Sequence, residues 1–360
     1  MKLKRHFVIY CILLINLVCY TGHSSKNVDF DKESFRKNIK PPVGEVYFHD
    51  SLFLGKPRYI QYHPDSFLIV LDMGTKNQIK IIDLKNRKIQ EMIPQGKGPG
   101  EMISAFGLQI KNRDLFVFCL QLSKVIKLTP DLNRKFFISE EFRIEEKQPL
   151  KFYPLKADTF VCISNIESDK RLTFLDSKGK IIRKLGDFPA LTNERREKIR
   201  GNNDVFGSYI TANPEGDKIF LACAYTDLFE IYDMKKMLIN RFKGPSGIKL
   251  TVHRKNIGKI GWVYQREPPF LAYCKLDSNE DEVWAGYVGF LEDRKKRSAF
   301  SDVYPKEIMC FNWKGKPLRR IEFDKPVLAF DFDWTSKVLY TIEWIDENPD
   351  IKYYSLRNYF

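Results

Sequence analysis

The chain has 360 residues, of which 43% are hydrophobic and 29% are charged, and its formal net charge is +14. Removing the three basic residues of the N-terminal signal described below leaves 57 basic against 46 acidic residues, so the excess persists at +11. Charge alone is compatible with nucleic acid, but a secretory signal argues against that partner and leaves acidic ligands or acidic surfaces as the expected ones.

Residues 1–24 have the layout of a secretory signal. Lys2, Lys4 and Arg5 precede an apolar run from Phe7 to Tyr20, and small residues suited to cleavage follow. The run is shorter than the ~20 residues that span a bilayer, so a transmembrane anchor is the less favoured alternative. We therefore expect an exported protein that is periplasmic, secreted or held at a membrane surface.

Cys19 stands at the end of this run and is a candidate for lipidation after signal cleavage. Val18 occupies the position where a bacterial lipoprotein signal usually has a small residue. A lipid on Cys19 would tether the protein to a membrane, whereas ordinary cleavage would leave it soluble. The sequence leaves both outcomes open, and a lipid anchor is the only membrane contact that it predicts.

After a polar linker over residues 25–43, the strand pattern predicts one β-propeller domain over residues 44–360. An apolar strand followed by a second strand, which often ends in a small polar residue, recurs six times. The early spacing is roughly 45 residues, the length of one four-stranded blade. The second strand of each pair reads, in chain order, Ile79–Asp83, Ile126–Thr129, Leu172–Asp176, Phe229–Asp233, Ile308–Asn312 and Ile351–Ser355. We predict an all-β fold with six four-stranded antiparallel blades, and a β-sandwich is the alternative.

The N-terminal stretch from Gly44 to Leu54 alternates apolar and polar residues before the first blade. We expect it to supply the outer strand of the last blade. Pairing the two chain ends in this way would remove an exposed strand edge and close the ring.

The connection from the first blade to the second, residues 95–101, reads Gln-Gly-Lys-Gly-Pro-Gly-Glu. It lacks the order of a phosphate-binding loop and follows an outer strand instead of opening a helix, so a tight turn between blades is expected. With the six-copy pattern, this turn resembles a bacterial family of six-bladed, TolB-like propellers, related in architecture to NHL-repeat proteins. The resemblance covers roughly residues 44–360 and implies a secreted or lipid-anchored propeller, but no particular activity. The later copies lack the turn, and residues 244–247 only echo it.

Cysteines and histidines give no catalytic or metal-binding pattern. Five cysteines remain beyond the signal without C-x-x-C spacing, so buried thiols in apolar strands of different blades are expected: Cys119, Cys162, Cys223, Cys274 and Cys310. His49, His63 and His253 are scattered singly, which disfavours a zinc hydrolase. The absence of a G-x-S-x-G motif disfavours a serine hydrolase.

Four loops are expected on one face of the propeller, because connections between blades and loops between second and third strands emerge together. They are residues 95–101, 186–208, 244–269 and 292–304. Three of them are basic, with Arg195, Arg196, Lys198, Arg200, Arg254, Lys255, Lys259, Arg266, Arg294, Lys295, Lys296 and Arg297. Converging on one rim, these side chains would form a positive collar suited to an anionic glycan, a carboxylate or phosphate ligand, or an acidic protein surface. The alternative is that long loops are charged simply because they are exposed.

The leading hypothesis is a non-catalytic propeller outside the cytoplasm that binds a ligand or protein partner through this basic face. The alternative is a calcium-dependent hydrolase or lactonase with an axial ion, for which Asp72, Asn165 and Asp227 are candidate ligands. Each of these residues would serve equally well as the cap of its own turn. Aromatic residues that would either line the pocket and stack on sugars or pack between blades are Tyr209, Tyr225, Phe270, Tyr273 and Tyr287.

Overall fold

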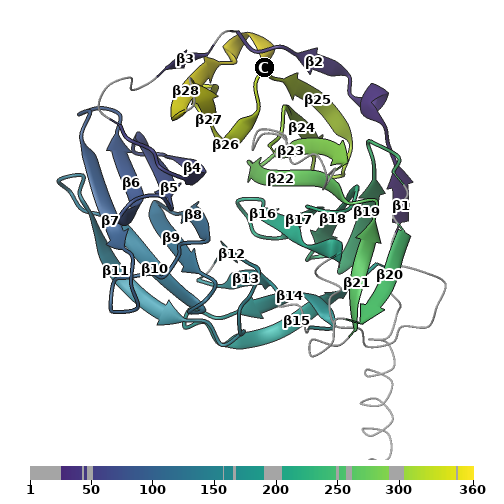
Figure 1. Ribbon diagram of the computed structural model, residues 1–360, viewed down its shortest axis with the longest axis horizontal. Coiled ribbons are helices and arrows are strands. Elements are labelled where there is room, and N and C mark those ends of the chain that lie inside the picture. The colour runs from purple at the N-terminus through teal and green to yellow at the C-terminus, as the bar shows by residue number, and fades with distance from the viewer. Residues whose placement is uncertain are drawn as a thin grey trace, which may run out of the picture.

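Six antiparallel sheets surround a central axis in the computed structural model (Figure 1). The structure describes residues 26–42, 44–46, 52–156, 158–164, 168–189, 205–248, 251–256, 262–291, 304–345 and 348–360. The predicted six-bladed propeller is confirmed, and the second strand of each predicted pair lies third from the axis. We label the strands of a blade A to D from the axis outward.

The first three blades contain only their own four strands. Blade 1 consists of β4 (Pro57–His63), β5 (Phe67–Asp72), β6 (Asn77–Asp83) and β7 (Ile89–Pro94). Blade 2 consists of β8 (Gly107–Lys111), β9 (Asp114–Cys119), β10 (Lys124–Pro130) and β11 (Phe136–Arg143). Blade 3 consists of β12 (Lys151–Pro154), β13 (Phe160–Ile163), β14 (Lys170–Leu175) and β15 (Ile181–Asp187).

The last three blades take up N-terminal strands. Blade 4 consists of β16 (Ser208–Ala212), β17 (Lys218–Cys223), β18 (Leu228–Asp233) and β19 (Leu238–Lys243), with β1 (Lys26–Asp29) outermost. Blade 5 consists of β22 (Phe270–Ser278), β23 (Glu282–Leu291), β24 (Glu307–Asn312) and β25 (Pro317–Glu322), with β2 (Lys37–Ile39) outermost. Blade 6 consists of β26 (Val327–Asp333), β27 (Val338–Ile345), β28 (Asn348–Ser355) and β3 (Glu45–Val46).

The ring closes as the sequence predicts. The short β3 pairs antiparallel with β28, with Val46 opposite Lys352. Each A strand also contacts the A strands of both neighbouring blades, including β26 with β4. The first and last blades are therefore joined both at the axis and at the outer edge.

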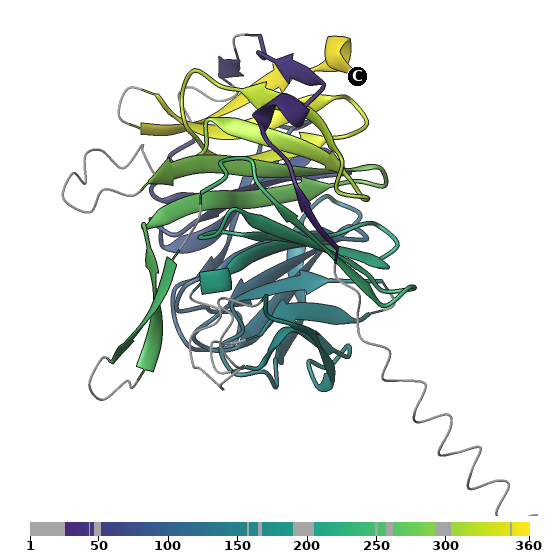
Figure 2. The ribbon, with the colours of Figure 1, turned by 90° about the vertical axis from the view of Figure 1, so that its right-hand side faces the viewer.

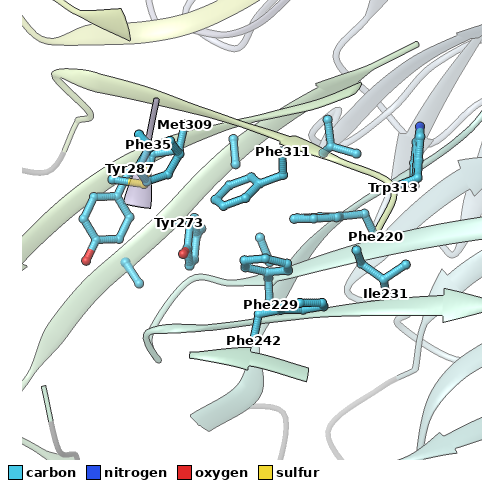
Figure 3. Packing of buried hydrophobic residues seen from close by; sticks show 14 of the residues in the cluster. Phe35, Phe220, Phe229, Ile231, Phe242, Tyr273, Tyr287, Met309, Phe311 and Trp313 are labelled. Atoms are coloured by element: carbon cyan, nitrogen blue, oxygen red, sulfur yellow. The ribbon is translucent and has the colours of Figure 1, made fainter. Parts of the chain in front are cut away.

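The hydrophobic core lies between successive blades because the B and C strands are buried on both faces, as in β5 and β18. Between blades 4 and 5 the core is aromatic. Phe229 lies 4.7 Å from Phe220, from Phe242 and from Phe311, measured between ring centroids (Figure 3). Such ring pairs add stabilising free energy to the blade interface beyond that expected from the apolar area they bury.

The predicted polar linker is wrong for residues 26–39. Strands β1 and β2 each pair in parallel with the D strand of a blade, and the 3-10 helix η1 (Lys32–Ser34) joins them. Phe35 and Ile39 are only 7% and 1% exposed and belong to the cores of blades 4 to 6. These two apolar residues among charged ones bind the segment, which we call the strap, to the propeller.

Two faces follow from the strand directions. The D-to-A and B-to-C connections emerge on one face, the loop face, which also carries the hairpin of β20 (Thr251–Asn256) and β21 (Trp262–Glu267) (Figure 2). The A-to-B and C-to-D turns emerge on the opposite one, the turn face. No helix in the described part of the chain is long and apolar enough to cross a membrane.

The five cysteines of the described ranges are free thiols, and all except the half-buried Cys274 are buried. Their predicted distribution over five blades is wrong in one respect, because Cys274 and Cys310 both belong to blade 5.

Candidate ligand site at the propeller axis

All six A strands contribute side chains to a narrow pocket on the axis. Its polar lining consists of Tyr59 and Gln61 from β4, Gln109 from β8, Lys151 from β12, Tyr209 from β16, Lys275 from β22 and Asp331 from β26. A strands begin at the loop face, so Lys151 and Tyr209, the first and second residues of their strands, lie toward that face. The sequence prediction of Tyr209 as a lining residue agrees with this position.

Lys275 reaches the axis because β22 is irregular there. The pairing with β23 slips between Cys274 and Leu276, so Lys275 is an extra residue without a partner across the strand pair. Its backbone φ of 48° is in the left-handed region, which residues other than glycine rarely adopt. Bulges of this kind re-aim a side chain, and here the redirected side chain is a cation.

The two lysines converge on Tyr59. Lys151 Nζ donates a hydrogen bond of 3.0 Å to the Tyr59 hydroxyl, and Lys275 Nζ lies 3.7 Å from the centroid of the Tyr59 ring. Lys151 Nζ also lies 4.7 Å from the ring centroid of Tyr209. Cation–π contacts of this length favour a positive charge over the ring face.

Neither lysine has a counter-ion among the described residues. Lys275 Nζ donates a hydrogen bond of 2.6 Å to the Arg58 carbonyl oxygen, and Lys151 has the Tyr59 hydroxyl. No carboxylate of the described chain forms an ion pair with either ammonium group. Burial lowers the pKa of Lys275, and the charge of Lys151 adds to this, while Tyr59 opposes it.

The positive charges act most strongly on Tyr59. Burial alone would raise the pKa of this phenol, but Lys151 and Lys275 outweigh burial and lower the pKa of Tyr59 to about 8. Tyr209 shows the opposite balance, since burial raises its pKa. The site therefore favours one negative charge at the position of the Tyr59 hydroxyl.

Carboxylates lie farther along the axis, toward the turn face. Burial, together with the neighbouring carboxylate of Asp277, raises the pKa of Asp331. Asp331 accepts a 2.6 Å hydrogen bond from the Tyr62 backbone N–H. Burial raises the pKa of Asp277 to about 7. A buried and a half-buried carboxylate near each other disfavour full ionisation of both, so they offset little of the positive charge at the other end.

The pocket is small. The cavity volume between the lining side chains is about 30 Å³, which holds about two water molecules, since each needs roughly 10–15 Å³ on this measure. A sugar ring therefore does not fit inside.

The other predicted aromatic residues lie away from the pocket lining. Phe270 is buried between blades 4 and 5. Tyr273 and Tyr287 are buried in the same cluster (Figure 3). Tyr273 donates a 2.7 Å hydrogen bond to the Gly244 carbonyl oxygen. Tyr225 is half-buried and stacks under the Arg266 guanidinium, whose carbon lies 3.7 Å from the ring centroid. The sequence left open whether these rings line the pocket or pack between blades. Phe270, Tyr273 and Tyr287 pack between blades.

The predicted calcium ligands are used as local caps. The Asp72 carboxylate accepts hydrogen bonds of 2.7–3.0 Å from the backbone N–H groups of Gly55, Lys56 and Gly74. Asp227 Oδ2 accepts from the backbone N–H of Ser246 at 2.7 Å and from its hydroxyl at 2.6 Å. Asn165 lies outside the described residues. Within the described ranges, no three His, Cys, Asp or Glu side chains are grouped so that they could hold a metal ion.

Most of the predicted basic rim lies outside the described residues, as does Cys19. This holds for Arg195, Arg196, Lys198, Arg200, Lys259, Arg294, Lys295, Lys296 and Arg297. Arg254 and Lys255 belong to β20, and their side chains are not described. Arg266 lies in β21 on the loop face, so the one described rim side chain is on the expected face.

The Gly-rich connection at residues 95–101 is the tight turn that the sequence predicts. Glu101 folds back to accept a 2.9 Å hydrogen bond from the Gly98 N–H, and a Cβ on Gly96 would lie 2.0 Å from the same Glu101 oxygen. Gly100, with φ of 71°, donates its N–H to Glu141 of blade 2 at 2.7 Å. The glycines are thus required by a structural contact between blades 1 and 2.

Comparison with known proteins identifies the family. The model of the TolB-like six-blade propeller family matches residues 34–335. The chain belongs to this family. No curated protein matches the sequence.

Two solved structures from Bacteroides share the fold. One is a member of the DUF4221 family from Bacteroides vulgatus, with a TM-score of 0.57, 12% identity, and coverage of 86% of this chain and 95% of the other. The second, from Bacteroides fragilis, is described as a candidate exported protein; its TM-score is 0.53 at 12% identity, covering 91% of this chain and 99% of the other. At this identity the likeness concerns the fold alone.

Proposed function

We propose that this protein is an exported, non-catalytic binding propeller that takes an anionic group of its ligand at the loop-face end of the axis. The observation that carries the proposal is the convergence of Lys151 and Lys275 on Tyr59 without a carboxylate partner. Two half-buried ammonium groups without a counter-ion attract an anion more strongly than exposed ones, because the surroundings screen them less.

An anionic glycan or a small carboxylate or phosphate ligand suits this site. The pocket, with a cavity volume of about 30 Å³, has room for a small charged group of the ligand but not for a whole sugar ring. Tyr59 and Tyr209 offer ring faces beside that group, and aromatic faces stack on sugars. Basic residues of the loops, among them Arg266, would enlarge the attraction around the mouth.

Export is supported by the N-terminal signal pattern and by the description of the Bacteroides fragilis neighbour. The calcium-dependent hydrolase receives less support. The Asp72 carboxylate and the Asp227 carboxylate each already accept two or more hydrogen bonds. A metal ion would have to compete with those donors.

The test is a thermal-shift series on the purified protein with a uronate oligosaccharide, a sulfated oligosaccharide and a neutral oligosaccharide of equal length. A ligand that binds the folded state raises Tm. We expect a shift with at least one anionic sugar, its loss at high salt, and no shift with the neutral sugar. Calcium and EDTA arms are included, and stabilisation by calcium that EDTA reverses would favour the hydrolase instead.

Two variants locate the site. Lys151→Gln and Lys275→Gln each remove one axial charge and are expected to abolish the shift. Lys76→Gln is the matched control, because Lys76 is an exposed lysine of a B-to-C loop on the same face. Equal binding by all three variants, or no difference between anionic and neutral sugars, contradicts an anion site at the axis.

A further inference from the structure

The C-to-D turns of blades 1 to 5 share one sequence pattern that the loop-face hypothesis does not use. Each begins with an Asp or Asn at or just after the end of the C strand and continues with two or three basic residues. The turns are residues 83–88, 131–135, 176–180, 233–237 and 312–316.

The acidic or amide side chain of each turn is directed to its own backbone. Asp176 Oδ1 accepts hydrogen bonds of 2.9 Å from the N–H groups of Lys178 and Lys180. Asn312 Oδ1 accepts equivalent bonds of 3.0 Å from Lys314 and Lys316. Asp83, Asp131 and Asp233 also cap their turns. The lysine side chains that follow the caps are exposed.

These turns carry eleven Lys and Arg residues against four Asp residues. Three of the cations are paired: Arg134 with Asp83, Lys235 with Asp217 and Lys236 with Asp233. The other eight form no ion pair with any residue of the described ranges, namely Lys85, Arg87, Lys88, Lys135, Lys178, Lys180, Lys314 and Lys316. We call these eight residues the basic ring.

The basic ring lies toward the outer rim of the turn face, because C and D are the outer two of the four strands A to D in each blade. Closer to the axis the A-to-B turns are acidic or neutralised, as at the exposed Glu280 and Asp281 and at Asp65, which pairs with Arg113. Positive charge is therefore spread around the circumference and not gathered in a pocket. Such a distribution fits an extended flat surface better than a small ligand.

Two apolar side chains project from the same turns. Leu132 is fully exposed, with a relative exposure of 103%, and Met237 is 40% exposed. Exposed apolar tips beside lysines are typical of surfaces that enter the boundary between lipid headgroups and acyl chains.

The first described residues of the strap lie at this face. Because β1 runs parallel to β19, it starts at the end of the blade where the C-to-D turn lies (Figure 2). Lys26 pairs with Asn240, only two residues after the first residue of β19. Strand β1 thus begins at the turn face, next to the basic turn of blade 4.

We propose that the turn face docks on an anionic phospholipid surface, with the basic ring against the headgroups and the loop face directed away from the membrane. Lysines within a Debye length of such a surface are attracted to its negative potential, and each adds to binding. The orientation would leave the axial site open to the surroundings. The proposal does not depend on the axial site or on lipidation.

Vesicle co-sedimentation of the purified protein tests the proposal. We expect binding to vesicles of phosphatidylcholine with phosphatidylglycerol, no binding to phosphatidylcholine alone, and loss of binding at high salt. A variant with Lys178, Lys180, Lys314 and Lys316 changed to Gln is expected to bind at least about tenfold more weakly. Leu132→Ser, which keeps the charge, is expected to weaken binding less.

The matched control carries four Lys→Gln changes on the loop face, at Lys56, Lys76, Lys97 and Lys325, all of which are exposed. It has the same net charge as the turn-face variant and is expected to bind vesicles as the unmodified protein does. Equal weakening by both variants shows a general charge effect and overturns the proposal. Failure to bind anionic vesicles, with or without binding to a soluble polyanion such as heparin, overturns it as well.

Discussion

The ionisation of Tyr59 gives a direct test of the axial electrostatics. With a pKa of about 8, Tyr59 is about 90% ionised at pH 9, whereas a tyrosine with an ordinary pKa of about 10 is about 10% ionised. Lys151→Met removes both the 3.0 Å hydrogen bond and the nearest positive charge. Because burial by itself raises the pKa of this phenol, we expect Tyr59 in the variant to be mostly neutral at pH 9.

Near-ultraviolet absorbance of the phenolate measures this directly. The chain has 17 tyrosines, of which 15 remain once residues 1–24 are removed, so the early titration should account for about one fifteenth of the total change. Tyr59→Phe must remove that early step while leaving the rest of the curve unchanged. A titration without a step below pH 9, or a step that persists in Tyr59→Phe, refutes the arrangement of charges described for the axis.

The same shift has consequences for binding and stability. An anion at the lysines repels the phenolate, so ligand binding should raise the pKa of Tyr59, and affinity for the anion should fall as the pH increases through 8. Since the pKa of Tyr59 is lower in the folded chain than in the unfolded chain, the unfolded chain binds more protons between about pH 8 and 10. The free energy of unfolding contributed by this group therefore rises with pH in that window and is lost as the pH falls through 8.

Three stability predictions follow from buried contacts, each measured by chemical denaturation. Arg171→Met should cost about 3–5 kcal/mol, because Arg171 and Glu230 form an ion pair with both side chains fully buried, and Arg171→Lys should recover only part of this. Ile39→Ala should cost about 2–5 kcal/mol at a 1% exposed site, while Val28→Ala, at a 45% exposed site in the same strap, should change stability by less than about 0.5 kcal/mol; equal effects would contradict a docked strap. Gly244→Ala should cost about 1–3 kcal/mol or more, because φ is 140° and the new Cβ would lie 2.0 Å from a strap carbonyl oxygen, and an unchanged midpoint would contradict that contact.

The blades were predictable because two buried strands in each repeat give a strong local signal. Strands such as β5 and β18 consist almost entirely of buried positions, and in blades 1 to 5 an Asp or Asn at or just after the end of the C strand marks the turn. The strap was not predictable in the same way. Its two strands have four and three residues, and their partners lie more than 200 residues away in the sequence. Only Phe35 and Ile39 distinguish the segment from a solvated linker.

The residues that line the axial pocket were only partly predictable from the sequence. The sequence indicated an axial pocket on the loop face and one of its lining residues, Tyr209. It did not indicate Lys151 and Lys275, because an isolated lysine at the start of a strand has no distinguishing neighbours. Lys275 additionally depends on a bulge in β22, and a one-residue slip changes which side chains face the axis. The one sequence feature that could have indicated these lysines is the presence of polar residues among the apolar residues of the A strands.

Net charge alone does not say where on the surface the charge lies. The basic insertions predict positive charge on the loop face. The eight residues of the basic ring, in contrast, occupy short turns on the turn face. A short turn looks unremarkable in the sequence, and the pattern becomes visible only when the propeller brings five such turns onto one rim. The two surfaces also differ in what they can hold, since two half-buried lysines select one charged group whereas a wide ring of exposed lysines selects an extended anionic surface. The Lys151→Gln variant and the four-lysine turn-face variant should therefore act independently, each affecting one binding partner and sparing the other.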